Sequence, residues 1–287
     1  MILSRRFSQV DVFGSGPLIG VNGNPVAVVH DADGLSDEQM AAFARWTNLS
    51  ETTFLLTPTS PSADYRLRIF TPGGELPFAG HPTLGSAHAW LAAGGAPRGV
   101  DIVQECGVGL VTVRRDGEDG LLGFQAPNLL RSGPVAPDDV ARIARALGIS
   151  PVEIVDTQWV DNGPGWVAAR LASAAAVLAL EPDFASFDGL SVGVVGLRGD
   201  ETTKDGAGDV EVRAFVPDFG INEDPVTGSL NAGIGQWLAG SVLPNSYVAA
   251  QGTVIGRRGR LKVTRDQNGQ VWVSGQTVTT ISGEVRL

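Results

Sequence analysis

Glu51 is the side chain best suited to move a proton. It follows a polar loop and begins the run from Glu51 to Leu56, whose composition predicts a strand. A carboxylate at an apolar strand end loses solvation, and its pKa then rises towards the range in which it exchanges protons with carbon acids. Exposed, the same residue would be an ordinary solvated acid. We therefore expect Glu51 to be a general acid and base.

Two glycine-led segments could together hold a carboxylate. Gly80 and Gly228 each lie three residues after a proline, and each precedes a run of small residues typical of a closely packed helix. Helix starts present unpaired backbone N–H groups and the positive end of the helix dipole. If the two starts face each other, they form a pocket for a small carboxylate, with Thr227 and Ser229 beside the second start.

His81 and Asp224 are the further polar side chains expected beside this carboxylate pocket. A histidine beside an anion pocket can donate to a substrate or share its proton, although a structural role is as common for a buried histidine. Asp224 lies nearer to the second glycine than Glu223 does. Glu75 and Glu223 are more typical of acidic residues that merely complement a helix dipole. We therefore expect His81 and Asp224 to contact the substrate amine or hydroxyl.

Other chemistries fit the chain poorly. Ser229, His81 and Asp224 form a nominal hydrolase triad, but the serine lacks the flanking glycines of a nucleophile elbow. No Gly-x-Gly-x-x-Gly opens a helix after a strand, so no dinucleotide site is predicted. Cys106 is the single cysteine, and the three histidines show no ligand spacing. We therefore expect no metal site and no dinucleotide site.

Composition restricts the partners. The 287 residues carry a net charge of -10, which repels nucleic-acid phosphates and anionic lipids. Lys204 and Lys262 are the only lysines, so a basic patch is not expected. The sequence has no signal-peptide pattern and no apolar run of about 18 residues or more. These features predict a cytoplasmic protein that binds a small-molecule carboxylate and neither nucleic acid nor membrane.

An internal repeat predicts the architecture. The segment 68–72 recurs in altered form at 213–217. Gly80 is likewise repeated as Gly228, 148 residues later. Short strands separated by turns, with one closely packed helix per half, indicate an α+β protein. We expect two similar domains related by a pseudo-twofold axis, each a curved, mostly antiparallel sheet wrapped around a central helix. The predicted domains are residues 1–128 and 129–287, and the last strand is a candidate to return to the first.

Local signals place several further elements. Ser36 and Gln39 predict a capping box and a helix ending near Thr47. A second amphipathic helix is predicted over residues 138–147, after a polar, proline-bearing linker over residues 128–137. Strands are predicted at residues 152–155 and at Val254. The long opening loop from Gly14 to Asn22 is a candidate to reshape one wall of a ligand cleft between the two halves.

Taken together, these motifs resemble the phenazine-biosynthesis PhzF-like family, within the diaminopimelate-epimerase-like fold. The resemblance covers the chain almost end to end, in blocks over residues 10–13, 23–25, 49–54, 68–72, 75–83 and 223–229. It implies a cleft between two domains, no cofactor and a homodimer. It also implies that Glu51 moves a proton between carbons of a dihydro-hydroxyanthranilate-like acid, with His81 and Asp224 beside it and Gly80 and Ser229 at the substrate carboxylate.

The related epimerases use one cysteine from each half as paired acid and base. The internal alignment places Ala79 and Thr227 at those positions, so racemisation by two cysteines is excluded. We therefore expect a cofactor-independent isomerase in which Glu51 takes a proton from a small cyclic or unsaturated amino or hydroxy acid and returns it elsewhere. A non-catalytic small-acid-binding or interaction protein, and an epimerase that pairs Glu51 with a second non-thiol base, are the alternatives.

Overall fold

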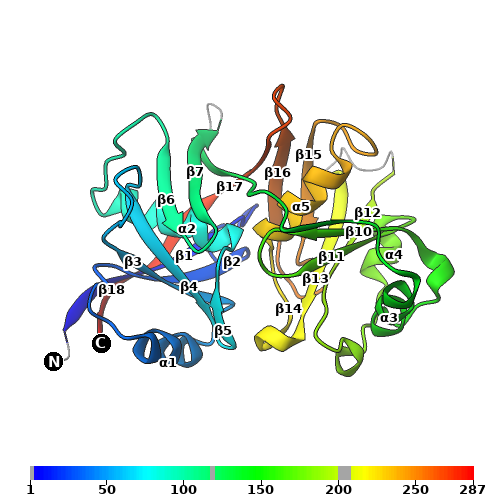
Figure 1. The fold of residues 1–287 in the computed structure, drawn as a ribbon, viewed down its shortest axis with the longest axis horizontal. Coiled ribbons are helices and arrows are strands. Elements are labelled where there is room, and N and C mark those ends of the chain that lie inside the picture. The colour runs from blue at the N-terminus through cyan, green and yellow to red at the C-terminus, as the bar shows by residue number, and fades with distance from the viewer. Residues whose placement is uncertain (1–2, 117–119, 200–207) are drawn as a thin grey trace.

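The two halves of the chain lie side by side in the computed structural model (Figure 1), which describes residues 3–116, 120–199 and 208–287. Both halves are built from strands with few helices, as expected of an α+β protein. None of the helices within these described ranges has the length and apolarity needed to span a lipid bilayer.

The first half is a sheet of seven neighbouring strands. In spatial order they are β1 (Ser4–Val12), β2 (Asn24–Val29), β3 (Glu51–Leu56), β4 (Tyr65–Thr71), β6 (Ile102–Cys106), β7 (Gly109–Asp116) and β8 (Leu121–Gln125). Successive neighbours pair antiparallel, parallel, antiparallel, parallel, antiparallel and antiparallel. The short strand β5 (Gly74–Leu76) forms a hairpin with β4.

The second half repeats this pattern pair for pair. Its strands are β10 (Ile154–Asp161), β11 (Trp166–Leu171), β12 (Ser191–Leu197), β13 (Val210–Val216), β15 (Ser246–Gln251), β16 (Gly259–Arg265) and β17 (Val271–Gly275). They pair in the same succession of antiparallel and parallel contacts. Strand β14 (Ile221–Glu223) forms a hairpin with β13, as β5 does with β4. The sequence repeat is thus a structural repeat.

The halves are joined by a reciprocal exchange of strands. Strands β8 and β17, which occupy equivalent places, pair antiparallel and make the sheet continuous. After β8 the chain runs to β9 (Arg131–Gly133), which pairs with β10 at the far edge of the second half. After β17 it runs to β18 (Thr277–Arg286), which pairs with β1 at the far edge of the first half. The division of the chain near residue 128 into two domains stays a prediction.

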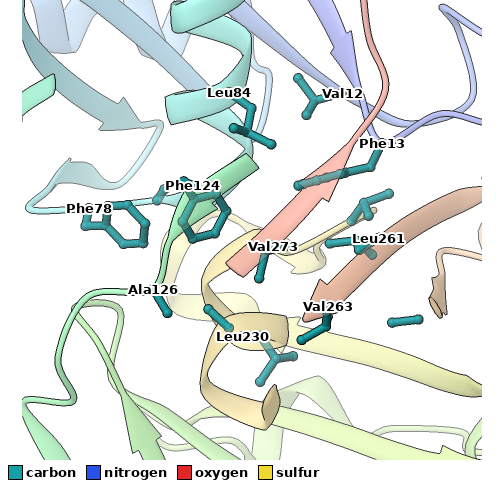
Figure 2. Close-up of a cluster of buried hydrophobic side chains, with 14 of the residues drawn as sticks. Val12, Phe13, Phe78, Leu84, Phe124, Ala126, Leu230, Leu261, Val263 and Val273 are labelled. Atoms are coloured by element: carbon teal, nitrogen blue, oxygen red, sulfur yellow. The ribbon is translucent and has the colours of Figure 1, made fainter. Parts of the chain in front are cut away.

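One central helix lies in each half, α2 (Gly80–Ala92) and α5 (Gly228–Leu238). Nine residues of each helix are buried, because small side chains allow strands to pack on several faces. Around these helices the core is continuous across the halves, as Figure 2 shows for Phe78, Phe124 and Leu84 from the first half and Leu230 and Val273 from the second. The helix starts therefore have a firm support on both sides.

The remaining helices cover the outer faces of the sheet. Helix α1 (Asp37–Thr47) has the predicted capping box between Ser36 and Gln39, and it packs its apolar face on β3 and β4. Helices α3 (Pro137–Leu147) and α4 (Ala174–Leu178) share a second apolar cluster with β11 and β12. Gly148 ends α3 with φ 70°, a left-handed conformation that glycine adopts without strain.

Three local predictions were wrong in part. The expected linker over residues 128–137 contains the strand β9. Pro151 begins a 3-10 turn that a Ser150 capping box stabilises, so the strand predicted over residues 152–155 starts only at Ile154. No strand forms at Val254, because Gly252 turns the chain with φ 87° directly after β15. Strand β15 itself was not predicted.

Candidate active site

The starts of α2 and α5 meet where the two halves join. A methyl group built on Gly80 would lie 2.7 Å from the Gly228 Cα, and one built on Gly228 would lie 2.8 Å from the Gly80 Cα. Only glycine fits at either position. The first amides of both helices have no acceptor within their own helix, so the positive ends of two dipoles converge on one place.

Glu51 and His81 form a buried pair beside these helix starts. Glu51 is the first residue of β3, His81 is the second residue of α2, and Glu51 Oε2 lies 3.2 Å from His81 Nε2. Burial raises the pKa of Glu51 well above its ordinary value, and the nearby charge of Asp224 raises it further. Burial lowers the pKa of His81 to about 3, partly offset by a hydrogen bond to the Pro25 carbonyl. These shifts favour a neutral imidazole beside a protonated carboxyl, and within the described residues neither Glu51 Oε2 nor His81 Nε2 has a hydrogen-bond partner.

Asn24 connects the two halves at this point. It is fully buried at the start of β2, and its Nδ2 donates to Asp224 Oδ1 at 2.8 Å and to the Val226 carbonyl at 3.0 Å. Both of its N–H hydrogens thus go to the second half of the chain. The same nitrogen lies 3.2 Å from His81 Nδ1, in the first half. Asn24 therefore ties the start of β2 to Asp224 and to the Val226 carbonyl, with His81 Nδ1 close by.

Asp224 is held by further hydrogen bonds from its own half. Thr227 Oγ1 donates to Asp224 Oδ2 at 2.5 Å, and Gln251 Nε2 donates to Thr227 Oγ1 at 2.8 Å. The Thr227 amide donates to Gln251 Oε1 at 3.0 Å. Burial raises the pKa of Asp224 to about 6, despite the lowering effect of hydrogen bonds from Thr227, Asn24 and Ser50. Asp224 therefore changes charge close to neutral pH.

Ser229 is the polar side chain on the other side of the pocket. It is the second residue of α5, and its Oγ accepts a hydrogen bond from Trp166 Nε1 at 3.0 Å. Trp166 is the first residue of β11 and is 2% exposed. The Ser229 carbonyl accepts a hydrogen bond from Asn162 Nδ2 at 2.9 Å. Ser229 is thus fixed at both its backbone and its hydroxyl.

These side chains line a small pocket with one polar end and one apolar wall. Glu51, Asp224, Thr227 and Ser229 provide the polar groups. The rest of the lining consists of Thr71, Leu76, Ala79, Pro164, Trp166, Val216, Phe219 and Ile221. The volume is about 30 Å³, enough for a water molecule or two but far below the roughly 300 Å³ of a typical ligand site.

The predicted site residues are thus brought together, but in different ways. Glu51, Asp224, Thr227 and Ser229 line the pocket, whereas Gly80, His81 and Gly228 lie behind it. The Thr227 hydroxyl is already engaged by Asp224 and Gln251.

The opening loop, Gly14 to Asn22, contributes no residue to the pocket lining, contrary to expectation. It packs instead on the turn before β16, where Ser15 Oγ donates to the Arg258 carbonyl at 2.7 Å.

Sequence reasoning missed Asn24, Trp166 and Gln251. Asn24 lies inside one of the recognised blocks, which was the one available signal for it, but no role was assigned. Trp166, at the start of β11, has no local sequence signal of a site residue, and Gln251 belongs to the unpredicted strand β15. Among the described residues, no group of three or more histidine, cysteine, aspartate or glutamate side chains is placed to hold a metal ion.

The chain is similar to known proteins over nearly all of its length. A sequence model of the family described as phenazine biosynthesis-like protein matches residues 10–283. A Schizosaccharomyces pombe protein named antisense-enhancing sequence 1 is 39% identical over 97% of both chains. The trans-2,3-dihydro-3-hydroxyanthranilate isomerase of Pseudomonas chlororaphis is 35% identical over 97% of this chain and 98% of its own. A Pseudomonas aeruginosa structure described as a predicted epimerase superposes with a TM-score of 0.75, at 28% identity over 98% of this chain and 99% of its own.

Proposed function

Because the chain belongs to the phenazine biosynthesis-like family and is an isomerase of that family, we propose that it moves a proton between two carbons of a small unsaturated or cyclic amino or hydroxy acid. Glu51 is the proton carrier in this proposal, and no cofactor takes part. The observation that supports it best is the buried contact of 3.2 Å between Glu51 Oε2 and His81 Nε2 at the pocket.

The electrostatics of the pair suggest the order of the steps. Burial raises the pKa of Glu51, which favours its acid form. We infer that Glu51 first donates its proton to one carbon, which breaks the Glu51 O–H bond and forms a C–H bond. The resulting carboxylate then takes a proton from another carbon on the same face. The electron pair of that C–H bond enters the substrate's unsaturated system, so substrate and product are isomers and Glu51 is restored.

His81 keeps the transferred proton on Glu51. A pKa of about 3 makes the imidazole a poor place to store a proton. Its Nε2, which has no other hydrogen-bond partner among the described residues, lies 3.2 Å from Glu51 Oε2 and could accept from the Glu51 carboxyl once that group turns towards it. The same carboxyl group therefore both gives and takes the proton, and His81 holds it in one orientation. Such positioned proton transfer typically contributes about 10²- to 10⁴-fold to a rate.

The other polar groups define the substrate that the pocket would accept. Ser229 and the two helix starts suit a carboxylate, and Asp224 suits an amine or hydroxyl. Trans-2,3-dihydro-3-hydroxyanthranilate, the compound in the name of the Pseudomonas relative, carries all three groups on an unsaturated ring. We propose this acid or a close analogue as the substrate. A homodimer in the cytoplasm stays a prediction, and light scattering would test the oligomeric state.

Deuterium exchange would test the function directly. In deuterium oxide, the wild-type protein should convert trans-2,3-dihydro-3-hydroxyanthranilate with incorporation of solvent deuterium at carbon, as measured by NMR. Glu51→Gln should lose at least about 100-fold in rate, because the amide cannot carry the proton. The exposed Glu38→Gln is the matched control and should keep full activity. Full turnover by Glu51→Gln would disprove the assignment.

The same experiment separates the alternatives. The name of the Schizosaccharomyces pombe relative refers to antisense enhancement and to no reaction, so a non-catalytic small-acid-binding or interaction protein is the second candidate. Such a protein would be thermally stabilised by the acid without any exchange. An epimerase would exchange the proton and also invert a stereocentre.

A further inference from the structure

Three hydroxyl groups line the pocket, those of Thr71, Thr227 and Ser229, and only that of Ser229 has its hydrogen free for a ligand. The Thr71 hydroxyl donates to the Gly74 carbonyl at 3.0 Å. The Thr227 hydroxyl donates to Asp224 Oδ2 and accepts from Gln251 Nε2. The Ser229 Oγ accepts from Trp166 Nε1, and within the described residues no acceptor is recorded for its own hydrogen. The Thr227 and Ser229 hydroxyls are therefore prepared for different tasks, one to hold Asp224 and the other to meet the substrate.

Trp166 determines the direction of the Ser229 hydrogen bond. An indole N–H can only donate, whereas a serine hydroxyl can donate one hydrogen and accept others. Because Trp166 Nε1 is 3.0 Å from Ser229 Oγ, the serine must act as acceptor towards the tryptophan. Its hydrogen is then left to point away from the indole, and Ser229 lines the pocket.

The turn that carries Trp166 is itself fixed against α5. Asp161 Oδ1 accepts hydrogen bonds from the amides of Gly163 and Gly165, both at 2.7 Å. Asn162 is fully buried, and its Nδ2 donates to the carbonyl of Ser229 at 2.9 Å. The segment from Asp161 to Trp166 thus contacts Ser229 twice, through Asn162 at its carbonyl and through Trp166 at its hydroxyl.

We propose that Trp166 is a positioning residue: by occupying one acceptor position of Ser229 Oγ it favours a serine that donates into the pocket, and so favours substrates that present a carboxylate at this point. This inference rests on the proposed function, in which Ser229 meets the substrate carboxylate. A group with its own N–H, such as a carboxamide, could bond through that N–H only to the one lone pair that Trp166 leaves on Ser229 Oγ. Trp166 therefore contributes to specificity through Ser229, in addition to forming part of the apolar wall.

Binding of a matched acid and amide would test this role without any turnover. The probes are anthranilate and 2-aminobenzamide, which differ in the carboxylate alone, and calorimetry gives the ratio of their affinities. The wild-type protein should prefer the acid. Trp166→Phe keeps an aromatic wall but removes the N–H, so Ser229 can rotate and accept from the amide. We expect the preference to fall about tenfold, which corresponds to ~1.4 kcal/mol.

The controls separate this role from a general effect on packing. Trp272→Phe also removes an indole hydrogen bond, the part-buried one from Nε1 to Asp266 Oδ2, and should leave the preference unchanged. Ser229→Ala should lower the preference as Trp166→Phe does, and the double variant should match Ser229→Ala alone. If Trp166→Phe fails to fold, Ser229→Ala still decides, because an unchanged preference in that variant would overturn the proposal.

Three other outcomes would also overturn it. They are an unchanged preference in Trp166→Phe, additive losses in the double variant, and equal affinity of the wild-type protein for acid and amide, including no binding of either. Failure of the proposed function would look different, because it would appear as the absence of Glu51-dependent deuterium exchange, whatever the binding preference.

Discussion

The internal repeat contains an arginine–glutamate pair in each half, and their different burial allows a quantitative prediction. Arg213 donates to both carboxylate oxygens of Glu223, at 3.0 and 2.8 Å, and to the Leu180 carbonyl at 2.8 Å. Arg68 holds Glu75 in the same two-pronged way, at 2.7 and 2.6 Å. The side chains of Arg213 and Glu223 are 4% and 7% exposed. Those of Arg68 and Glu75 are 17% and 42% exposed.

Removing either arginine should therefore have unequal costs. Arg213→Met leaves the Glu223 carboxylate buried without its partner, and breaking such a pair costs about 3–5 kcal/mol. Arg68→Met leaves a carboxylate that water can reach, and exposed pairs contribute about 1 kcal/mol or less. Urea unfolding followed by circular dichroism would measure both changes in the free energy of unfolding. Equal losses in the two variants would refute the argument from burial.

The double variant provides the internal control. Arg213→Met/Glu223→Gln removes the charge that Arg213→Met exposes to an apolar surrounding, so it should recover part of the lost stability. The site should respond as well, since the charge of Glu223 raises the pKa of the adjacent Asp224. Without Arg213 to neutralise it, this charge should move the Asp224-dependent part of the pH–rate profile to higher pH. No shift in the profile would mean that the pair acts on stability alone.

Two further predictions concern the site itself. Because burial raises the pKa of Asp224 from 3.8 to about 6, the folded protein holds this proton more tightly than the unfolded chain. The associated stabilisation should be complete below about pH 4 and should be lost as the pH rises through about 6. Asp224→Asn should remove this pH-dependent change, about 3 kcal/mol in the free energy of unfolding, when unfolding is measured at a series of pH values. Gly80→Ala places a methyl group 2.7 Å from the Gly228 Cα, so it should lower the melting temperature and the rate of exchange, whereas Gly283→Ala, with open space around it, should change neither.

The architecture could be predicted because the relevant information is local and repeated. The capping box at Ser36 and the glycines at the starts of α2 and α5 are properties of short segments, and the 148-residue spacing of Gly80 and Gly228 indicates two related halves. The burial of Glu51 followed from its place at an apolar strand end. These features do not depend on knowing which strand lies beside which.

The contacts that support the site could not be predicted in the same way. Asn24 and Asp224 are 200 residues apart, and their hydrogen bond exists only because the exchange of strands brings the halves together. Trp166 has no local feature that distinguishes it from a core tryptophan. The strand expected at Val254 shows the reverse error, since Val254 and Ile255 look apolar enough for a strand but are 49% and 40% exposed in a turn.

The exchange of β9 and β18 has an evolutionary meaning. A single half would end in a strand with no place in its own sheet, and two copies could each lay that strand along the edge of the other, as in a domain-swapped dimer. Fusion of two such genes would give the present connectivity, with β8 and β17 at the former interface. In such an ancestor the two helix starts would have been identical. Glu51 and Trp166 do not occupy equivalent places in the two halves, so they make the two sides of the pocket different.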